Sequence, residues 1–317
     1  MSQPETELGA QVQVAADPPP LVAVDAPDRR RLAGAFSALV SIGLVGFVFL
    51  HFGQHGLSEL EGMIPRHPAF WLGFLGYYML MPLSEWVIYR RLWGLPASGI
   101  AALMRKQVSN ELLLGYLGEA QFYGWARSRL AMTTAPFGAI KDSTILSALM
   151  GNVATVALLG ATWPLISAGG MFSSLHSLFV SLSVVLVTSF AILLFRRNLF
   201  SLPARQLHFI AGVHTVRIFG MLGLATLMWN VVLPAIPISL WLVLATLRML
   251  VSRLPLMPNK DAVFAAIVVV VLGRNMEVSD LLTMMAGLLL FTHVCVAAVF
   301  GLGELAGDLR RRATAVG

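Results

Sequence analysis

Long apolar stretches separated by short polar segments dominate this chain. Six of them approach or exceed the length of a membrane-spanning helix, and they are expected at residues 32–52, 70–89, 143–164, 177–195, 207–229 and 281–303. A hydrocarbon core of about 30 Å needs roughly 20 helical residues to cross. The short alternating segments of a membrane β-barrel do not occur in the sequence. The pattern predicts an all-α fold, a polytopic transmembrane helix bundle of about six full spans.

Two further apolar stretches do not simply cross. Basic residues lie on both sides of residues 107–125, so this stretch should begin and end on one face and be re-entrant or interfacial. The stretch 237–273 is interrupted between Arg253 and Asp261, and its halves either both cross or form a re-entrant hairpin. Broken segments entering from opposite faces often frame a mid-membrane site in secondary transporters.

The two ends differ from the apolar middle. Residues 1–31 hold acidic side chains, a run of three prolines and no helical period, which predicts a disordered cytoplasmic tail. A signal peptide would begin with positive charge and a short apolar run, so we expect no cleavage. Residues 32–305 form the predicted bundle, and residues 306–317 form a short basic cytoplasmic tail.

Composition excludes a soluble domain, because 57% of the residues are hydrophobic and only 12% are charged, against roughly a quarter charged in soluble proteins. The net charge of +6 is concentrated beside the predicted spans, at Arg29–Arg31, Arg90–Arg91 and Arg310–Arg312. Basic residues in such positions record topology. They predict a bacterial inner-membrane protein with both termini in the cytoplasm and without a nucleic-acid partner.

The sequence contains only weak signals for catalytic or metal-binding sites. Cys295 is the single cysteine, so we expect no disulfide or cysteine metal cluster and interpret it as a small core residue. His51 and His55 have metal-ligand spacing but no third ligand. No nucleotide-binding loop, serine-hydrolase elbow or metalloprotease motif occurs. We therefore expect no metal, no cofactor and no enzymatic activity.

Ionisable side chains inside apolar segments remain after topology is accounted for. They are Glu85, Glu111, Glu119, His214, Arg217, Arg248, Arg253, Lys260, Asp261 and His293. Each charge costs about 2.5–3.5 kcal/mol at the bilayer centre on insertion scales. These side chains should therefore face the bundle interior or a wet cavity.

Some of these residues have a plain local interpretation. Glu85 precedes Arg90 by about one turn, which allows an ion pair at the end of one helix. His293 stands alone on an apolar helix and is expected to be a hydrogen-bonded core residue. Glu119 follows two glycines, Gly115 and Gly118, where the chain should turn within the membrane, so it is a candidate for a functional cavity.

The arginines need partners from elsewhere. His214 and Arg217 are three residues apart and share a helical face, and Arg248 has no acidic neighbour in its own helix. The candidate partners are Glu119, Asp261 or an anionic ligand such as a lipid phosphate, which arginine can bind with two hydrogen bonds. A structural salt bridge between helices is the alternative.

Three motifs resemble the family of membrane proteins related to the transmembrane, flippase half of lysylphosphatidylglycerol synthase. They are Glu85–Trp93, with its tryptophans and arginines; Asn110–Glu119 followed by Arg127; and Leu254–Pro258 before a short apolar segment. The resemblance covers about residues 33–305. Leu114 stands where the family usually has proline, and Asn259, Lys260 and Asp261 replace its glycines.

The resemblance implies movement of a lipid or lipid-linked substrate between leaflets. The synthase also has a soluble aminoacyl-transferase domain that this sequence lacks, so aminoacylation is not expected. The substrate-binding residues that we predict are Asn110, Glu119, Arg127, Arg217, Arg248, Arg253 and Asp261.

We therefore predict a flippase-like protein that moves or binds an anionic lipid or lipid-linked envelope precursor. Two alternatives stay open. The chain could be a non-catalytic partner that anchors an envelope-lipid or polysaccharide biosynthesis enzyme through its acidic tail. It could also be an intramembrane transferase, although no pair of nucleophile and base is evident.

Overall fold

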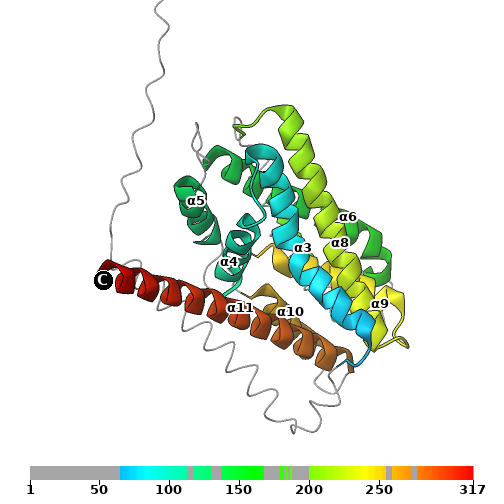
Figure 1. Ribbon diagram of the computed structural model, residues 1–317. Helices are drawn as coiled ribbons and strands as arrows, with labels where there is room; N and C mark the ends of the chain where they lie inside the picture. The colour runs from blue at the N-terminus through cyan, green and yellow to red at the C-terminus, as the bar shows by residue number, and fades with distance from the viewer. Residues whose placement is uncertain are drawn as a thin grey trace, which may run out of the picture.

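The computed structural model describes nine stretches of the chain, which are residues 65–112, 117–129, 137–167, 179–181, 183–184, 186–187, 200–254, 259–272 and 277–316. At residues 128–129 and 301–316 it describes the backbone only. Every regular element in these stretches is helical, as the sequence predicts. The helices are α3 (Pro68–Trp93), α4 (Gly99–Leu112), α5 (Leu117–Arg129), α6 (Phe137–Ser167), α8 (Ala204–Val232), α9 (Ile238–Ser252), α10 (Lys260–Leu272) and α11 (Glu277–Val316) (Figure 1).

Among the described residues, three helices are long and apolar enough to cross a membrane. They are α6, α8 and the Glu277–Phe300 part of α11, and they contain or overlap the predicted spans 143–164, 207–229 and 281–303. Helix α3 has 26 residues and a length of about 39 Å; it covers the predicted span 70–89 but is not among these three helices. The predicted span 32–52 and the tail 1–31 lie outside the described residues, and 177–195 is described only in part.

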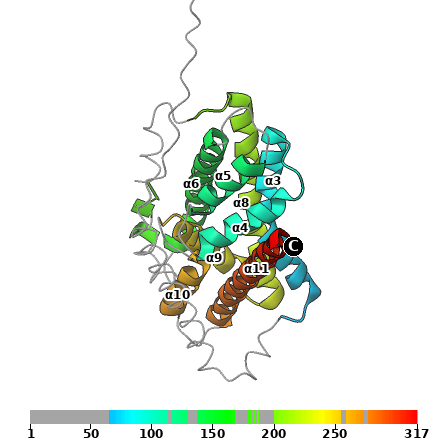
Figure 2. The ribbon, with the colours of Figure 1, turned by 60° about the vertical axis from the view of Figure 1, so that its left-hand side comes forward.

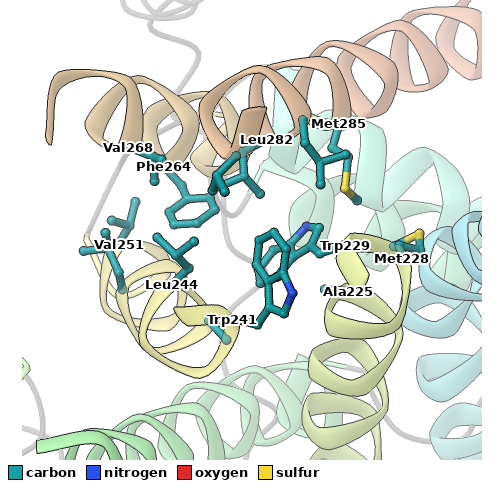
Figure 3. Packing of buried hydrophobic residues seen from close by; sticks show 14 of the residues in the cluster. Ala225, Met228, Trp229, Trp241, Leu244, Val251, Phe264, Val268, Leu282 and Met285 are labelled. Carbon is teal, nitrogen blue, oxygen red and sulfur yellow. The ribbon is translucent and has the colours of Figure 1, made fainter. Parts of the chain in front are cut away.

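Helix α8 packs against α3, α6 and α9 (Figure 1). On another side, α11 packs against α10 and α4, and α4 packs against α5 (Figure 2). The largest hydrophobic cluster joins α8, α9, α10 and α11 around the indoles of Trp229 and Trp241, whose ring centroids are 5.5 Å apart (Figure 3). Phe264 of α10 stacks on Trp229 in the same cluster.

Both predicted interruptions occur. Helix α4 ends at Leu112 and α5 begins at Leu117, while α9 ends at Ser252 and α10 begins at Lys260. The first segment is longer than the predicted 107–125, because α4 begins at Gly99. Hydropathy places Arg105 and Lys106 in a cytoplasmic loop, but Lys106 is buried within the helix, where carboxylates neutralise its charge.

The two interrupted segments meet where the first one breaks. The backbone N–H of Asn259, just before α10, donates to the carbonyl of Glu111 near the end of α4 at 3.1 Å. Asn259 has a φ of 44°, and asparagine is one of the few residues that adopt this left-handed conformation readily. Its side chain also accepts from the N–H of Ala262 at 3.2 Å, which caps α10. This turn therefore ties the start of α10 to the end of α4.

A proline interrupts the hydrogen bonds of α3 near its middle. Pro82 has no N–H, so the carbonyl of Tyr78 has no partner in the regular helical pattern. The side-chain amide of Gln107 in α4 lies 3.5 Å from that carbonyl and donates to it. Helix α4 thus contacts α3 at the point where α3 lacks an internal hydrogen bond.

Candidate functional site

A buried lysine joins two carboxylates from different helices. The Nζ atom of Lys106 in α4 lies 2.6 Å from Glu85 Oε1 in α3 and 3.4 Å from Glu119 Oε1 in α5. The side chains of Lys106 and Glu85 are only 3% and 7% exposed, whereas that of Glu119 is 18% exposed. We call these three residues the lysine triad. One ammonium therefore serves two carboxylates.

The predicted pairing of Glu85 with Arg90 is wrong. The Arg90 guanidinium lies over the ring of Trp86, 4.8 Å from its centroid, while the Glu85 carboxylate points to α4. A buried carboxylate is stabilised more by a buried ammonium than by an arginine at the helix surface, because less water screens the interaction. The pair links two helices and does not close one helix end.

Asn110 and Gly118 hold α5 against α4 beside the triad. The side-chain oxygen of Asn110 accepts from the Gly118 N–H at 2.8 Å. Gly118 approaches α4 so closely that a Cβ atom there would overlap the Lys106 carbonyl. This close approach brings Glu119, the next residue, within reach of the Lys106 side chain. Asn110, predicted as a substrate-binding residue, thus has a structural role in this arrangement.

His214 and Arg217 face α6 from one side of α8, as their spacing predicts. The Nε2 atom of His214 lies 3.0 Å from the carbonyl oxygen of Ser143 and 3.3 Å from its hydroxyl. One Arg217 nitrogen, Nη2, donates to Ser147 Oγ at 2.8 Å. Both side chains are buried. Arg217 forms no ion pair with a carboxylate of the described residues.

Arg248 pairs with Asp261 across the interruption between α9 and α10. Both Nε and Nη2 of Arg248 lie 2.7 Å from Asp261 Oδ1, and Nη2 also donates to the hydroxyl of Tyr77 in α3. Asp261 is one of the partners that the sequence suggests. The carboxylate of Glu111 interacts electrostatically with Asp261 and Arg248. The end of α4 therefore contributes to the same charged region.

A small pocket opens beside this ion pair. It has a volume of about 20 Å³, which is room for about one water molecule. Polar groups form one part of its wall and apolar groups the rest. The lining residues are Tyr77, Arg248 and Asp261, with Ala225, Trp229, Phe264, Leu282, Met285, Ala286 and Leu289. In this conformation Arg248 and Asp261 are in direct contact, and the pocket is too small for a lipid headgroup.

An apolar cluster connects the neighbours of the two arginines. Ile218 follows Arg217, Met249 follows Arg248, and these two hydrophobic residues pack together with Ala154 of α6. Apolar contacts of this kind exclude water. The described residues therefore form two distinct polar regions. One holds the lysine triad and Arg217, and the other holds the Arg248–Asp261 pair. A packed apolar contact between α8 and α9 lies next to both arginines.

The predicted substrate-binding residues do not all lie together in the part of the chain that the structure describes. Arg127 is exposed on α5, outside both polar regions. The Arg253 guanidinium lies against Gly151 of α6 and donates to Ser252 at 2.8 Å. Glu119 and Arg217 belong to one region and Arg248 and Asp261 to the other.

Sequence reasoning missed Lys106, whose signal was its helical spacing. It follows Ala102 and Leu103 by four and three residues, so all three lie on one buried face of α4. Counting Lys106 with its neighbour Arg105 as a topology signal hid this pattern. Tyr77 was also missed, since an aromatic residue in an apolar segment gives no sign of its hydroxyl's partner.

Two residues of α11, His293 and Cys295, were predicted to lie in the core. His293 is buried, and its Nδ1 lies 3.1 Å from the hydroxyl of Tyr78, which confirms the expected hydrogen-bonded core histidine. Cys295 is exposed, so its interpretation as a core residue is wrong. Two residues along a helix correspond to a rotation of about 200°, and this places Cys295 on the face opposite to His293.

In the part of the chain that the structure describes, the fold is all-helical and three helices are suited to crossing a membrane. No protein-family model matches the chain, and neither a curated protein nor a solved structure matches it. The resemblance to the flippase half of lysylphosphatidylglycerol synthase therefore stays a prediction from the sequence motifs.

Proposed function

We propose that the chain is a flippase-like protein of the bacterial inner membrane, with both termini in the cytoplasm, that moves or binds an anionic lipid or lipid-linked envelope precursor. The observation that carries the proposal is the position of the buried charges. The Arg248–Asp261 pair and the lysine triad lie beside two interrupted helix pairs that meet where Asn259 binds the Glu111 carbonyl. Interrupted helices with charged groups at their breaks are typical of substrate sites in transporters.

The energetic cost of these charges supports a functional role. Moving an ion pair into a low-dielectric interior costs several kcal/mol for each ion, and a well-packed apolar pair is often as stable or more stable. An apolar bundle built for stability alone needs neither Arg248 nor Lys106. Ionisable residues at such positions mark substrate or ion pathways in many membrane proteins.

The contact between Arg248 and Asp261 suggests how a headgroup binds in the pocket. An anionic phosphate can take the place of Asp261 on the Arg248 guanidinium, because arginine binds phosphate and carboxylate with the same planar set of donors. The exchange leaves one cation bound to one anion, so the charge around Arg248 stays balanced while Asp261 turns away. The apolar wall formed by Trp229, Phe264 and Met285 is suited to the first carbons of an acyl chain.

The two polar regions suggest a route with two positions. A headgroup bound near Arg248 must pass the contact of Ile218 with Met249 to reach Arg217. That apolar contact then acts as the barrier whose opening exposes one position after the other. The acyl chains stay in the bilayer throughout.

Leaflet exchange in reconstituted vesicles tests the proposal. The protein is placed in phosphatidylcholine vesicles that contain a trace of fluorescent phosphatidylglycerol, and a membrane-impermeant reductant quenches the label in the outer leaflet. We expect the protein to accelerate exchange and Arg248→Gln to slow it at least tenfold. Arg205→Gln, an exposed arginine on α8, is the matched control and should behave as wild type.

Two results would overturn the proposal. One is an exchange rate equal to that of empty vesicles for phosphatidylglycerol and for every lipid-linked precursor tested. The other is an Arg248→Gln variant that exchanges lipid as fast as the Arg205→Gln control.

A further inference from the structure

Two buried polar atoms without hydrogen-bond partners lie on the face of α8 that contacts α6. They are His214 Nδ1 and Arg217 Nη1, and the two residues are 1% and 7% exposed. Buried polar groups in proteins are nearly always hydrogen-bonded, so two such atoms only three residues apart on one helix call for an explanation.

These side chains share one neighbourhood. Ser143 contacts His214 through both of its oxygens, and the buried Tyr89 of α3 forms a side-chain hydrogen bond with the same serine. Arg217 interacts electrostatically with Tyr89 and with His214. Residues from three helices therefore surround one interior position.

The charge of Arg217 is the first indication of a ligand. Lys106 forms ion pairs with both Glu85 and Glu119, whereas the hydrogen bond that Arg217 donates among the described residues goes to a serine hydroxyl. Glu85 also interacts electrostatically with Arg217, but the two do not form an ion pair in direct contact. A bound anion would satisfy Nη1 and give the guanidinium an ion pair of its own.

The hydrogen bonds of His214 indicate which kind of anion would fit beside Arg217. The Ser143 carbonyl can only accept a hydrogen bond, so the His214 Nε2 atom that contacts it carries the proton. In the neutral imidazole the other nitrogen, Nδ1, is then an acceptor. An acceptor beside an arginine suits a ligand that has both a negative charge and a hydroxyl group.

We propose that Arg217, His214 and Tyr89 form an internal binding position for an anionic group that carries a hydroxyl, such as a phosphoglycerol headgroup or monohydrogen phosphate. Arg217 binds the anionic oxygen, His214 Nδ1 accepts from the hydroxyl, and the Tyr89 hydroxyl bonds a second oxygen. The inference rests on the proposed function and gives the substrate class of its second position. Its test measures binding, so its failure is distinct from a failure of leaflet exchange.

Two pairs of probes separate the charge from the hydroxyl. The full chain in nanodiscs of phosphatidylcholine is titrated with phosphatidylglycerol and with phosphatidylmethanol, which has the same phosphodiester but no hydroxyl. In detergent it is titrated with monohydrogen phosphate and with sulfate, which has no proton to donate. Binding is followed by the ligand-dependent shift in the midpoint of thermal unfolding. A preference of about tenfold for the hydroxyl-bearing member of either pair is expected, since one hydrogen bond to an otherwise unsatisfied acceptor is worth roughly 1–1.5 kcal/mol.

The variants assign the preference to these residues. Arg217→Gln should abolish binding of every probe, and His214→Phe should remove the preference for the hydroxyl. Tyr89→Phe deletes one oxygen without changing the packed ring, so it should fold normally and weaken binding severalfold. Arg205→Gln is again the exposed control on α8 and should bind as wild type.

The outcomes are distinct. A preference shown only by the lipids identifies a headgroup position, and one shown only by the free anions identifies a site for a soluble phosphate; both support the inference. Equal binding of phosphatidylglycerol and phosphatidylmethanol together with equal binding of phosphate and sulfate overturns it. Binding that is as tight in Arg217→Gln and in Tyr89→Phe as in wild type also overturns it, and ordered water then satisfies His214 Nδ1 and Arg217 Nη1.

Discussion

Replacing Lys106 by methionine should destabilise the protein strongly. The substitution keeps the unbranched shape of the side chain and most of its length but removes the ammonium, and it leaves the carboxylates of Glu85 and Glu119 without their shared cation. Removing one member of a buried ion pair typically costs about 3–5 kcal/mol. We expect Lys106→Met to lower the free energy of unfolding by an amount in that range.

The geometry of the triad also ranks its two acids. Glu85 is the closer and more buried partner, at 2.6 Å from the ammonium, whereas Glu119 lies at 3.4 Å and is 18% exposed. Glu85→Gln keeps an oxygen that can accept from the ammonium but removes the negative charge, and it should cost about 1.5–3 kcal/mol. Glu119→Gln loses a weaker, partly hydrated interaction and should cost about 1 kcal/mol or less.

Unfolding in mixed detergent micelles with increasing dodecyl sulfate, followed by circular dichroism, measures these differences. The double variant Lys106→Met with Glu85→Gln should be more stable than the sum of the single losses predicts, because the two groups no longer leave each other unpaired. A Lys106→Met variant within about 0.5 kcal/mol of wild type would refute the reasoning. So would a Glu119→Gln variant less stable than Glu85→Gln.

Two other substitutions test the packing. Gly118→Ala should destabilise the contact of α4 with α5 by more than about 2 kcal/mol, because its Cβ would overlap the backbone carbonyl of Lys106. Gly124→Ala in the same helix meets no atom within 4 Å and should be neutral or stabilising by up to about 1 kcal/mol; equal unfolding midpoints for both variants would contradict this account. Cys295, the single cysteine, faces outward from α11, so in vesicles it should react with an apolar maleimide and not with a charged one. Mass spectrometry measures this labelling, and labelling that occurs only after unfolding would contradict the exposure of Cys295.

The helices follow closely from the hydropathy pattern, whereas the pairing of charges does not. Helices α6 and α8 contain the predicted spans because an apolar segment of about 20 residues has few other structures available in a bilayer. The pairing of Glu85 with Lys106 joins residues 21 positions apart in two helices. Sequence distance alone favoured Arg90, which is nearer in the chain but turned toward Trp86.

The candidate site was predicted best where the chain itself limits the choices. Arg248 and Asp261 flank an interruption of only a few residues, so Asp261 was among the few acids able to reach that arginine. Arg127 and Arg253 were placed in the same cavity on their charge alone. The face of the helix that carries each of them depends on packing between segments, which a single sequence does not reveal.

Pro82 divides α3 into two arms that serve different parts of the molecule. Tyr77 precedes the proline and binds Arg248, whereas Glu85 follows it and binds Lys106. A helix bends most easily at a proline, where one backbone hydrogen bond of the helix is already missing. Helix α3 therefore joins the Arg248–Asp261 pair to the lysine triad, and a bend at Pro82 would let the arm that carries Tyr77 move away from Arg248 while Glu85 stays paired with Lys106.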